Sequence, residues 1–164
     1  MMLQGNPIYF RNFVFGVEDS LVSTVGLLSG IAIAGVEERT IFLTGVVLIL
    51  VEAFSMAAGS FLSETSAQEY AQQIEDSGSH PLFGGVVMFF SYFVAGFIPL
   101  FPYILYEPTA AFQLSIIYSL AALFLLGMLS GALARTRLMK NALRMLVIGG
   151  VAIGAGVLAG IFLS

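Results

Sequence analysis

Three carboxylates interrupt apolar stretches of this sequence that otherwise carry no charge. Glu18 and Asp19 lead directly into LVSTVGLLSG, and the next charged residue is Glu37. Glu52 follows the apolar run GVVLILV and precedes AFSMAAG. A carboxylate at the centre of a bilayer costs roughly 2.5–3.5 kcal/mol on insertion scales, so it persists where it has a partner or a task. Glu52 could be the partner in a structural hydrogen bond. Alternatively, it could form a site that binds a cation or a proton.

A thioether lies one helical turn beyond Glu52. A helix would place one set of residues on a single face, because they recur at spacings of three and four: Glu52, Met56, Gly59, Ser60 and Ser63. Carboxylate oxygens supply charge, and sulfur favours softer ions over magnesium or calcium. Taken alone, Met56 could be an ordinary core residue. Its combination with Asp19 and Glu52 indicates a site for a divalent transition metal.

The composition places these residues in a membrane. Of 164 residues, 59% are hydrophobic and 10% are charged, whereas soluble domains are about a quarter charged. The few basic residues lie near the ends of apolar segments, so no nucleic-acid partner is expected. The sequence contains no Cys and one His, and no nucleophile–base set is evident, so neither an enzyme nor a prosthetic group is expected.

Five segments reach the roughly 20 apolar residues that a spanning helix needs. We predict an all-α membrane protein with a single transmembrane domain over residues 1–164. Its predicted spans are about 12–35, 41–62, 82–105, 110–133 and 143–163. Pro99 and Pro102 should kink or end the third span. Four tyrosines are expected at the membrane interfaces: Tyr9, Tyr92, Tyr103 and Tyr106.

The basic residues predict the orientation. The connector RTRLMKNALR (135–144) carries four of them, and Arg11 flanks the first span on the same side. The positive-inside rule therefore places the N-terminus in the cytoplasm and the C-terminus outside. The acidic connector 63–81 is then cytoplasmic too. Its ionisable side chains could capture cations or simply solvate the loop: Glu64, Glu69, Glu75, Asp76 and His80.

Depth brings the candidate ligands together. Asp19 lies about seven residues from the cytoplasmic end of its span, on the order of 10 Å into the membrane. Met56 lies at a similar depth in the second span, and Glu52 is one turn farther in. If these spans are antiparallel neighbours, Asp19, Glu52 and Met56 share one polar pocket. Glu18 points about 100° away from Asp19 and faces either a second helix or a water-filled entrance near Glu64.

Stripes of small residues predict close helix packing. Gly26, Gly30 and Ala34 are spaced by four, as are Gly150 with Gly154 and Gly156 with Gly160. Such stripes let helices approach closely, either within one chain or between two protomers. The stripe in the first span could thus pack against another span or form the seam of a dimer.

The same segments resemble a known family. FRNFVFGVEDSLVSTVGLLSG is similar to the first-span signature of the vacuolar iron transporter family, R-x-x-x-F-G-x-x-D-G-x-V-S-T. LVEAFSMAAGSFLS resembles its second-span pattern A-x-S-M-A-A-G-E-Y-x-S, and FVAGFIPLFPYIL its third-span pattern G-A-x-I-P-L-x-P-Y/F. ALRMLVIGG fits the start of its last span, so the resemblance covers nearly the whole chain in order.

The resemblance implies a five-span homodimer with a metal path between the two first spans. Iron(II), and often manganese(II), would leave the cytosol in exchange for protons. Asp19 matches the pathway aspartate of the family, and Met56 matches its pathway methionine. The chain departs from the patterns at Asn12, Ser20 and Ser60, where the family has Asp, Gly and Glu. Its 63–81 connector is also short, where many members carry a long, Glu-rich metal-binding domain.

We therefore expect a transporter that takes up cytosolic metal near Glu64 and Glu18 and binds it at Asp19, Glu52 and Met56. Protons would compete for the carboxylates and release the metal. The alternatives are a passive channel for divalent cations and a non-transporting sensor or assembly protein of the same fold. We expect an integral protein in contact with membrane lipid, in a prokaryotic plasma membrane or a vacuolar-type membrane.

Overall fold

The computed structural model describes residues 7–71 and 80–163, and the regular elements in these ranges are all helices. In order they are α1 (Pro7–Ile33), α2 (Glu38–Ala71), α3 (Pro81–Leu100), α4 (Pro102–Leu105), α5 (Pro108–Leu133) and α6 (Leu138–Leu163). All but the short α4 are long and apolar enough to cross a membrane. The predicted all-α membrane fold with five spanning helices is confirmed.

Local sequence explains where the helices begin and end. Proline occupies the first position of α1, α3 and α5, where a helix has no use for the missing N–H. The turn after α1 contains a glycine in the left-handed region, Gly35, with φ of 76°. The amides of Gly35 and Val36 donate to the carbonyls of Ala32 and Ile31, at 3.1 and 3.2 Å, and so satisfy the last turn.

The prolines of the third span break it as expected. Pro99 lies inside the last turn of α3, and Pro102 starts α4 after a break at Phe101. Proline has no N–H to continue the helical ladder, so the chain changes direction near this end of the bundle. The Ser115 hydroxyl of α5 donates to the Pro99 carbonyl at 2.7 Å and ties the bend to the next helix.

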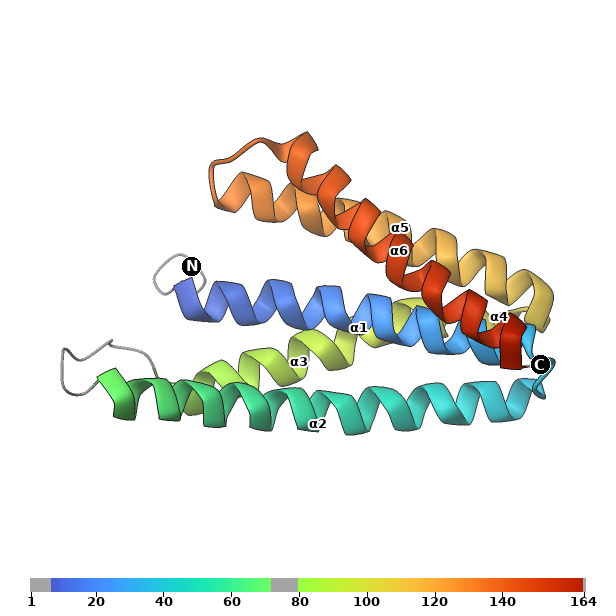
Figure 1. Cartoon of the computed structure of the whole chain (residues 1–164), viewed down its shortest axis with the longest axis horizontal. Coiled ribbons are helices and arrows are strands. Elements are labelled where there is room, and N and C mark those ends of the chain that lie inside the picture. The colour runs from blue at the N-terminus through green and yellow to red at the C-terminus, as the bar shows by residue number, and fades with distance from the viewer. Residues whose placement is uncertain (1–6, 72–79, 164) are drawn as a thin grey trace.

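α1 is the central helix of the bundle (Figure 1). It packs against α3 on one side and α6 on the other, while α2 packs mainly against α3. α5 and α6 form a hairpin whose connecting turn diverges from the start of α1. The start of α1 and the end of α6 lie at opposite ends of the bundle. Which end faces the cytoplasm stays a prediction.

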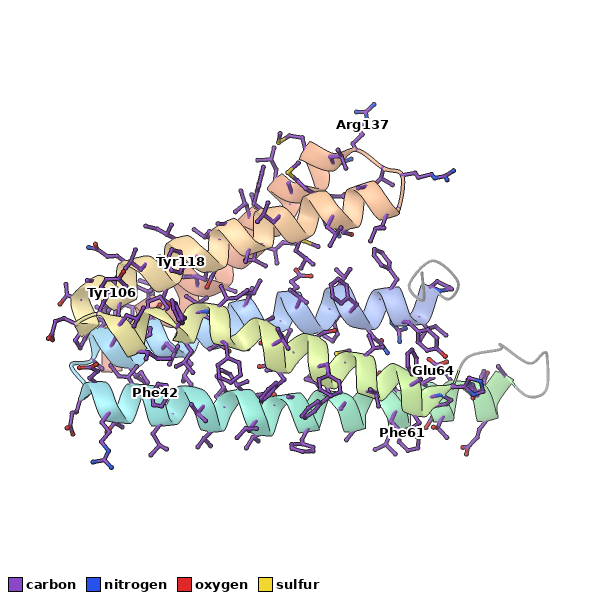
Figure 2. All side chains as sticks on the ribbon, turned by 180° about the vertical axis from the view of Figure 1, so that it is seen from behind. Phe42, Phe61, Glu64, Tyr106, Tyr118 and Arg137 are labelled. Carbon is purple, nitrogen blue, oxygen red and sulfur yellow. The ribbon has the colours of Figure 1, made fainter. Side chains whose placement is uncertain are left out.

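The outer and inner surfaces differ in chemistry. Large apolar side chains such as Phe42 and Phe61 project outward from α2 (Figure 2). α1, by contrast, is the least apolar and most buried of the spanning helices. Its buried side chains include several polar ones: Asn12, Ser20, Thr24 and Ser29. The polar interior of the bundle therefore follows α1.

The small-residue stripe of α1 packs within the chain. A Cβ added to Gly156 of α6 would lie 2.5 Å from the carbonyl oxygen of Gly26, and one added to Gly30 would lie 2.9 Å from that of Gly156. Gly160 also lies against Gly30. The sequence left open whether this stripe packs against another span or forms the seam of a dimer, and in the structure it packs against α6. A seam formed by Gly26 and Gly30 with a second copy is not compatible with it.

α2 continues past the predicted end of the second span at residue 62. It runs without a break to Ala71, so the first part of the predicted connector 63–81 is a helical extension. Glu64 and Glu69 lie on this extension. Glu75 and Asp76 lie outside the described residues.

Candidate metal-binding site

Asp19 of α1 and Glu52 of α2 are electrostatic neighbours. Both side chains are partly buried, and the two carboxylates lie within electrostatic range of each other. They meet because α1 and α2 both pack on small residues of α3. Gly96 is the clearest case, since a Cβ there would lie 2.6 Å from the Ile49 side chain and 2.9 Å from the Ser20 hydroxyl. Helix α3 thus holds the two acidic helices in register.

Met56 lines an open groove beside these carboxylates. The groove has a volume of about 630 Å³. Phe15, one turn before Asp19, and Met56, one turn after Glu52, both line it. Asp19 and Glu52 themselves do not line the groove, so Met56 lies about one helical turn from the two carboxylates, and the grouping of Asp19, Glu52 and Met56 as one site stays a prediction.

Met88 is a second thioether in this groove, and the sequence analysis missed it. It lies on α3, is almost fully buried, and lines the groove together with Met56. Its sulfur packs against Gly16 of α1, 3.1 Å from where a Cβ would be. A methionine in an apolar span carries no local signal that separates a groove residue from a core residue. Only the pairing of α1 with α3 identifies it.

Tyr92 was expected at the membrane interface, and that prediction is wrong. Its side chain is fully buried in the middle of α3. Its hydroxyl is 2.7 Å from the Ser23 hydroxyl, and its carbonyl accepts a 2.6 Å hydrogen bond from Ser20. The phenol also lies within electrostatic range of Asp19 and Glu52. Tyr103 is likewise buried, because α4 packs it against α5.

Glu18 lies on another side of α1 from the groove. It borders a separate pocket of about 260 Å³ formed with α5 and α6. The polar lining residues there are Ser130, Asn141 and Arg144, and the Arg144 guanidinium interacts electrostatically with Glu18. The structure therefore does not bring Glu18 into the groove with Met56. The sequence left open whether Glu18 faces a second helix or a water-filled entrance, and in the structure it faces a second helix.

Glu64 follows Ser63, a lining residue of the groove, on the part of α2 near the start of α1 (Figure 2). Its buried carboxylate is 4.0 Å from the Arg11 guanidinium, a long ion pair between α2 and α1. Gln68 donates to Glu64 at 3.4 Å. Glu64 is therefore engaged by side chains of the chain itself, about three turns of α2 away from Glu52.

Two positions that depart from the family pattern meet beside Arg11. The Asn12 side chain donates to the Ser60 hydroxyl at 2.8 Å and to the Gly84 carbonyl at 3.1 Å. A Cβ on Gly84 would lie 3.0 Å from that amide nitrogen, so glycine makes room for it. Where the pattern has two acids, this chain has a neutral hydrogen-bonded pair that joins α1, α2 and α3.

Within residues 7–71 and 80–163, no three Asp, Glu or His side chains gather in one place. His80, the one histidine, precedes α3, and its amide donates to the Tyr9 hydroxyl at 2.9 Å. The largest acidic grouping that the described residues show in this region is the interacting pair Asp19 and Glu52, with Met56 one turn beyond Glu52.

Comparison with known proteins identifies a family. The model of the VIT family matches residues 10–78 and 72–161 of this chain. The two matched segments meet in the connector between α2 and α3, and together they cover nearly all of the sequence. No curated protein matches the chain.

Proposed function

This chain belongs to the VIT family, a membership that implies metal-ion transport across a membrane, and on that premise we propose that it exports a divalent transition metal from the cytosol. Family members are transporters and not enzymes, in keeping with the absence of a nucleophile–base set in the sequence. The proposed cargo is iron(II), with manganese(II) as the second ion.

The facing carboxylates of Asp19 and Glu52 carry this proposal. Two like charges that lie close together in a partly buried site repel one another, and a divalent cation between them removes that repulsion. Their oxygens provide charge for a divalent ion. The Met56 and Met88 thioethers along the adjoining groove favour a transition metal over magnesium or calcium.

The same pair of carboxylates suits exchange for protons. A carboxylate oxygen that binds a metal ion can bind a proton instead, so a proton and a metal compete for one site. A proton that arrives from the outer side would displace the metal, and a metal from the cytosol would displace the proton. We therefore propose antiport, with uptake through the groove from the end where Arg11 and Glu64 lie.

We further propose that the chain works as a homodimer. The groove is open to the outside of a single chain, and the exposed Phe15 lies on its rim. A second copy placed over this face would close the groove and duplicate the carboxylates across a two-fold axis. Because Gly26 and Gly30 already contact α6, the seam would lie along the part of α1 that contains Phe15.

Metal flux in proteoliposomes tests the proposal. Vesicles that enclose an iron-sensitive dye and contain the purified protein should take up iron(II), provided that a pH gradient drives the exchange. Asp19→Asn and Met56→Ala should transport far less than the native protein. The matched control is Glu38→Gln, because Glu38 is an exposed acid at the first residue of α2, far from Met56. This variant should leave the rate unchanged.

Each alternative has its own outcome in this assay. Flux that ignores the pH gradient would indicate a passive divalent-cation channel. No flux under any gradient, from protein that is folded, would indicate a sensor or assembly protein. Transport by Asp19→Asn and Met56→Ala at the native rate would show that the proposed site is wrong.

A further inference from the structure

We infer that Tyr92 is a positioning residue of the carboxylate site, a neutral hydroxyl that orients Asp19 and Glu52 for a cation. The inference rests on the proposed function. It starts from placement, because the Tyr92 hydroxyl is 2.7 Å from the Ser23 hydroxyl. Ser23 lies four residues after Asp19, on the same face of α1. The phenol therefore lies about one helical turn from the Asp19 side chain.

The packing of α2 against α3 also places Tyr92 near the carboxylates. Gly85 of α3 lies against Ala57, and Gly96 lies against Ile49, so the two helices run antiparallel. Tyr92 is one turn before Gly96 on α3, and Glu52 is about one turn after Ile49 on α2. This register puts Tyr92 level with Glu52, in agreement with its electrostatic interaction with both carboxylates.

Two hydrogen bonds from α1 hold residue 92. Ser20 donates to its carbonyl at 2.6 Å, while Ser23 engages its hydroxyl. Ser20 and the Tyr92 ring are completely buried, so neither is free to choose another rotamer without repacking. A hydroxyl fixed in this way is preorganised, as a group that positions ligands must be.

The chemistry of the phenol suits this role. A buried hydroxyl offers one proton to donate and lone pairs that accept. When the Ser23 hydroxyl donates to the phenol oxygen, the phenol proton remains available to a carboxylate or to a water molecule between them. A neutral donor steadies two like charges while no cation is bound. It adds no positive charge that would repel an incoming metal, whereas a lysine or arginine there would.

Single-hydroxyl substitutions isolate this contribution. Tyr92→Phe keeps the buried ring and removes one oxygen, and Ser23→Ala removes the group that orients that oxygen. Tyr118→Phe is the matched control, because Tyr118 projects from the outer surface of α5 (Figure 2). Each purified variant is titrated with manganese(II) by calorimetry, and its thermal unfolding is recorded without metal.

We expect Tyr92→Phe to weaken manganese binding about tenfold, since loss of a group that orients a ligand typically costs 10–100-fold in metal affinity. Ser23→Ala should weaken it less, and the double variant should be no worse than Tyr92→Phe alone. Tyr118→Phe should bind like the native protein. A purely structural role would instead lower the melting temperature and leave the affinity of the folded fraction unchanged.

The outcomes separate this inference from the proposed function. Native protein that binds no manganese overturns the proposed function, and this inference with it. Native protein that binds, together with Tyr92→Phe of equal affinity, overturns the role of Tyr92 alone. If Tyr92→Phe does not fold, Ser23→Ala decides: native affinity in that variant overturns the inference, and weakened affinity supports it.

Discussion

Glu18 and Asp19 are adjacent on α1, yet they meet opposite surroundings. Asp19 faces a second carboxylate, Glu52, beside a groove that contains two thioethers. Glu18 faces the Arg144 guanidinium in a smaller pocket between α1, α5 and α6. Successive helical residues point about 100° apart, which is enough to place them against different helices.

The difference shows where an added cation would be favoured. On the Glu18 side, the Arg144 guanidinium of the chain itself lowers the cost of the negative charge. On the Asp19 side, the interacting group is a second carboxylate, so an added cation or proton would relieve their repulsion. Two acidic residues that look alike in the sequence therefore have different electrostatic surroundings, and the proposed function gives them different tasks.

The largest effect is expected when a cationic side chain replaces Glu52 beside Asp19, as Arg144 lies beside Glu18. Glu52→Lys would place an ammonium group opposite Asp19 and fill the role proposed for the metal. We expect metal transport to fall roughly 100-fold or more, beyond the 10–100-fold effects of outer-sphere changes, while the protein remains folded. Initial rates of manganese uptake by proteoliposomes, with melting curves alongside, measure both. Uptake at the native rate would contradict the proposed role of the pair.

A milder change removes one charge and adds none. Glu52→Gln keeps the size of the side chain but leaves Asp19 as the single carboxylate. We expect manganese affinity to fall by about tenfold to a hundredfold, and transport to depend less steeply on the pH gradient. Glu38→Gln is the control of the same chemistry on the same helix. Equal losses in both variants would point to a general effect of acidic charge.

The thioether is expected to affect ion selectivity as well as rate. Met56→Leu conserves volume and hydrophobicity, so the fold should tolerate it at a cost below about 1.5 kcal/mol. We expect the preference for iron(II) over magnesium to fall several-fold, because sulfur favours softer ions. Competition between the two ions in the dye assay measures this preference. An unchanged ratio would assign Met56 to packing alone.

The smallest effect is expected on the Glu18 side. Glu18→Gln and Arg144→Gln should each change the initial transport rate by less than about twofold. Each should lower stability by at most about 1 kcal/mol, as is usual for interactions between charges that water can reach. The double variant should lose no more than either single variant, and this double-mutant cycle isolates their coupling. A transport loss as large as that of Glu52→Gln would place Glu18 in the metal path after all.

Much of the fold follows from local features of the sequence. Apolar length identifies the five spanning helices, and Pro99 and Pro102 locate the break in the third. The spacing of Glu52 and Met56 places both on one face of α2, because helical periodicity depends only on the helix itself. Depth on two antiparallel helices predicted Met56 level with Asp19 and Glu52 one turn farther in, and in the structure Asp19 interacts electrostatically with Glu52.

Other features depend on which helices are neighbours. The burial of Tyr92, the place of Met88 in the groove and the pairing of Glu64 with Arg11 carry no local signal. Each follows from the register between two helices that are distant in the sequence. The glycines of α1 show this most clearly, since their spacing predicts a close contact but cannot say that α6 provides the other surface.

Glu18 and Asp19 of α1 show which properties a single segment determines and which depend on the packing of other segments. Hydropathy and helical periodicity are properties of one segment, so they establish that Glu18 and Asp19 lie within an apolar helix and point in different directions. The electrostatic energy of each acid depends on charges carried by other segments. Only the packing of α2 and α6 on opposite flanks of α1 gives Asp19 a carboxylate and Glu18 a guanidinium.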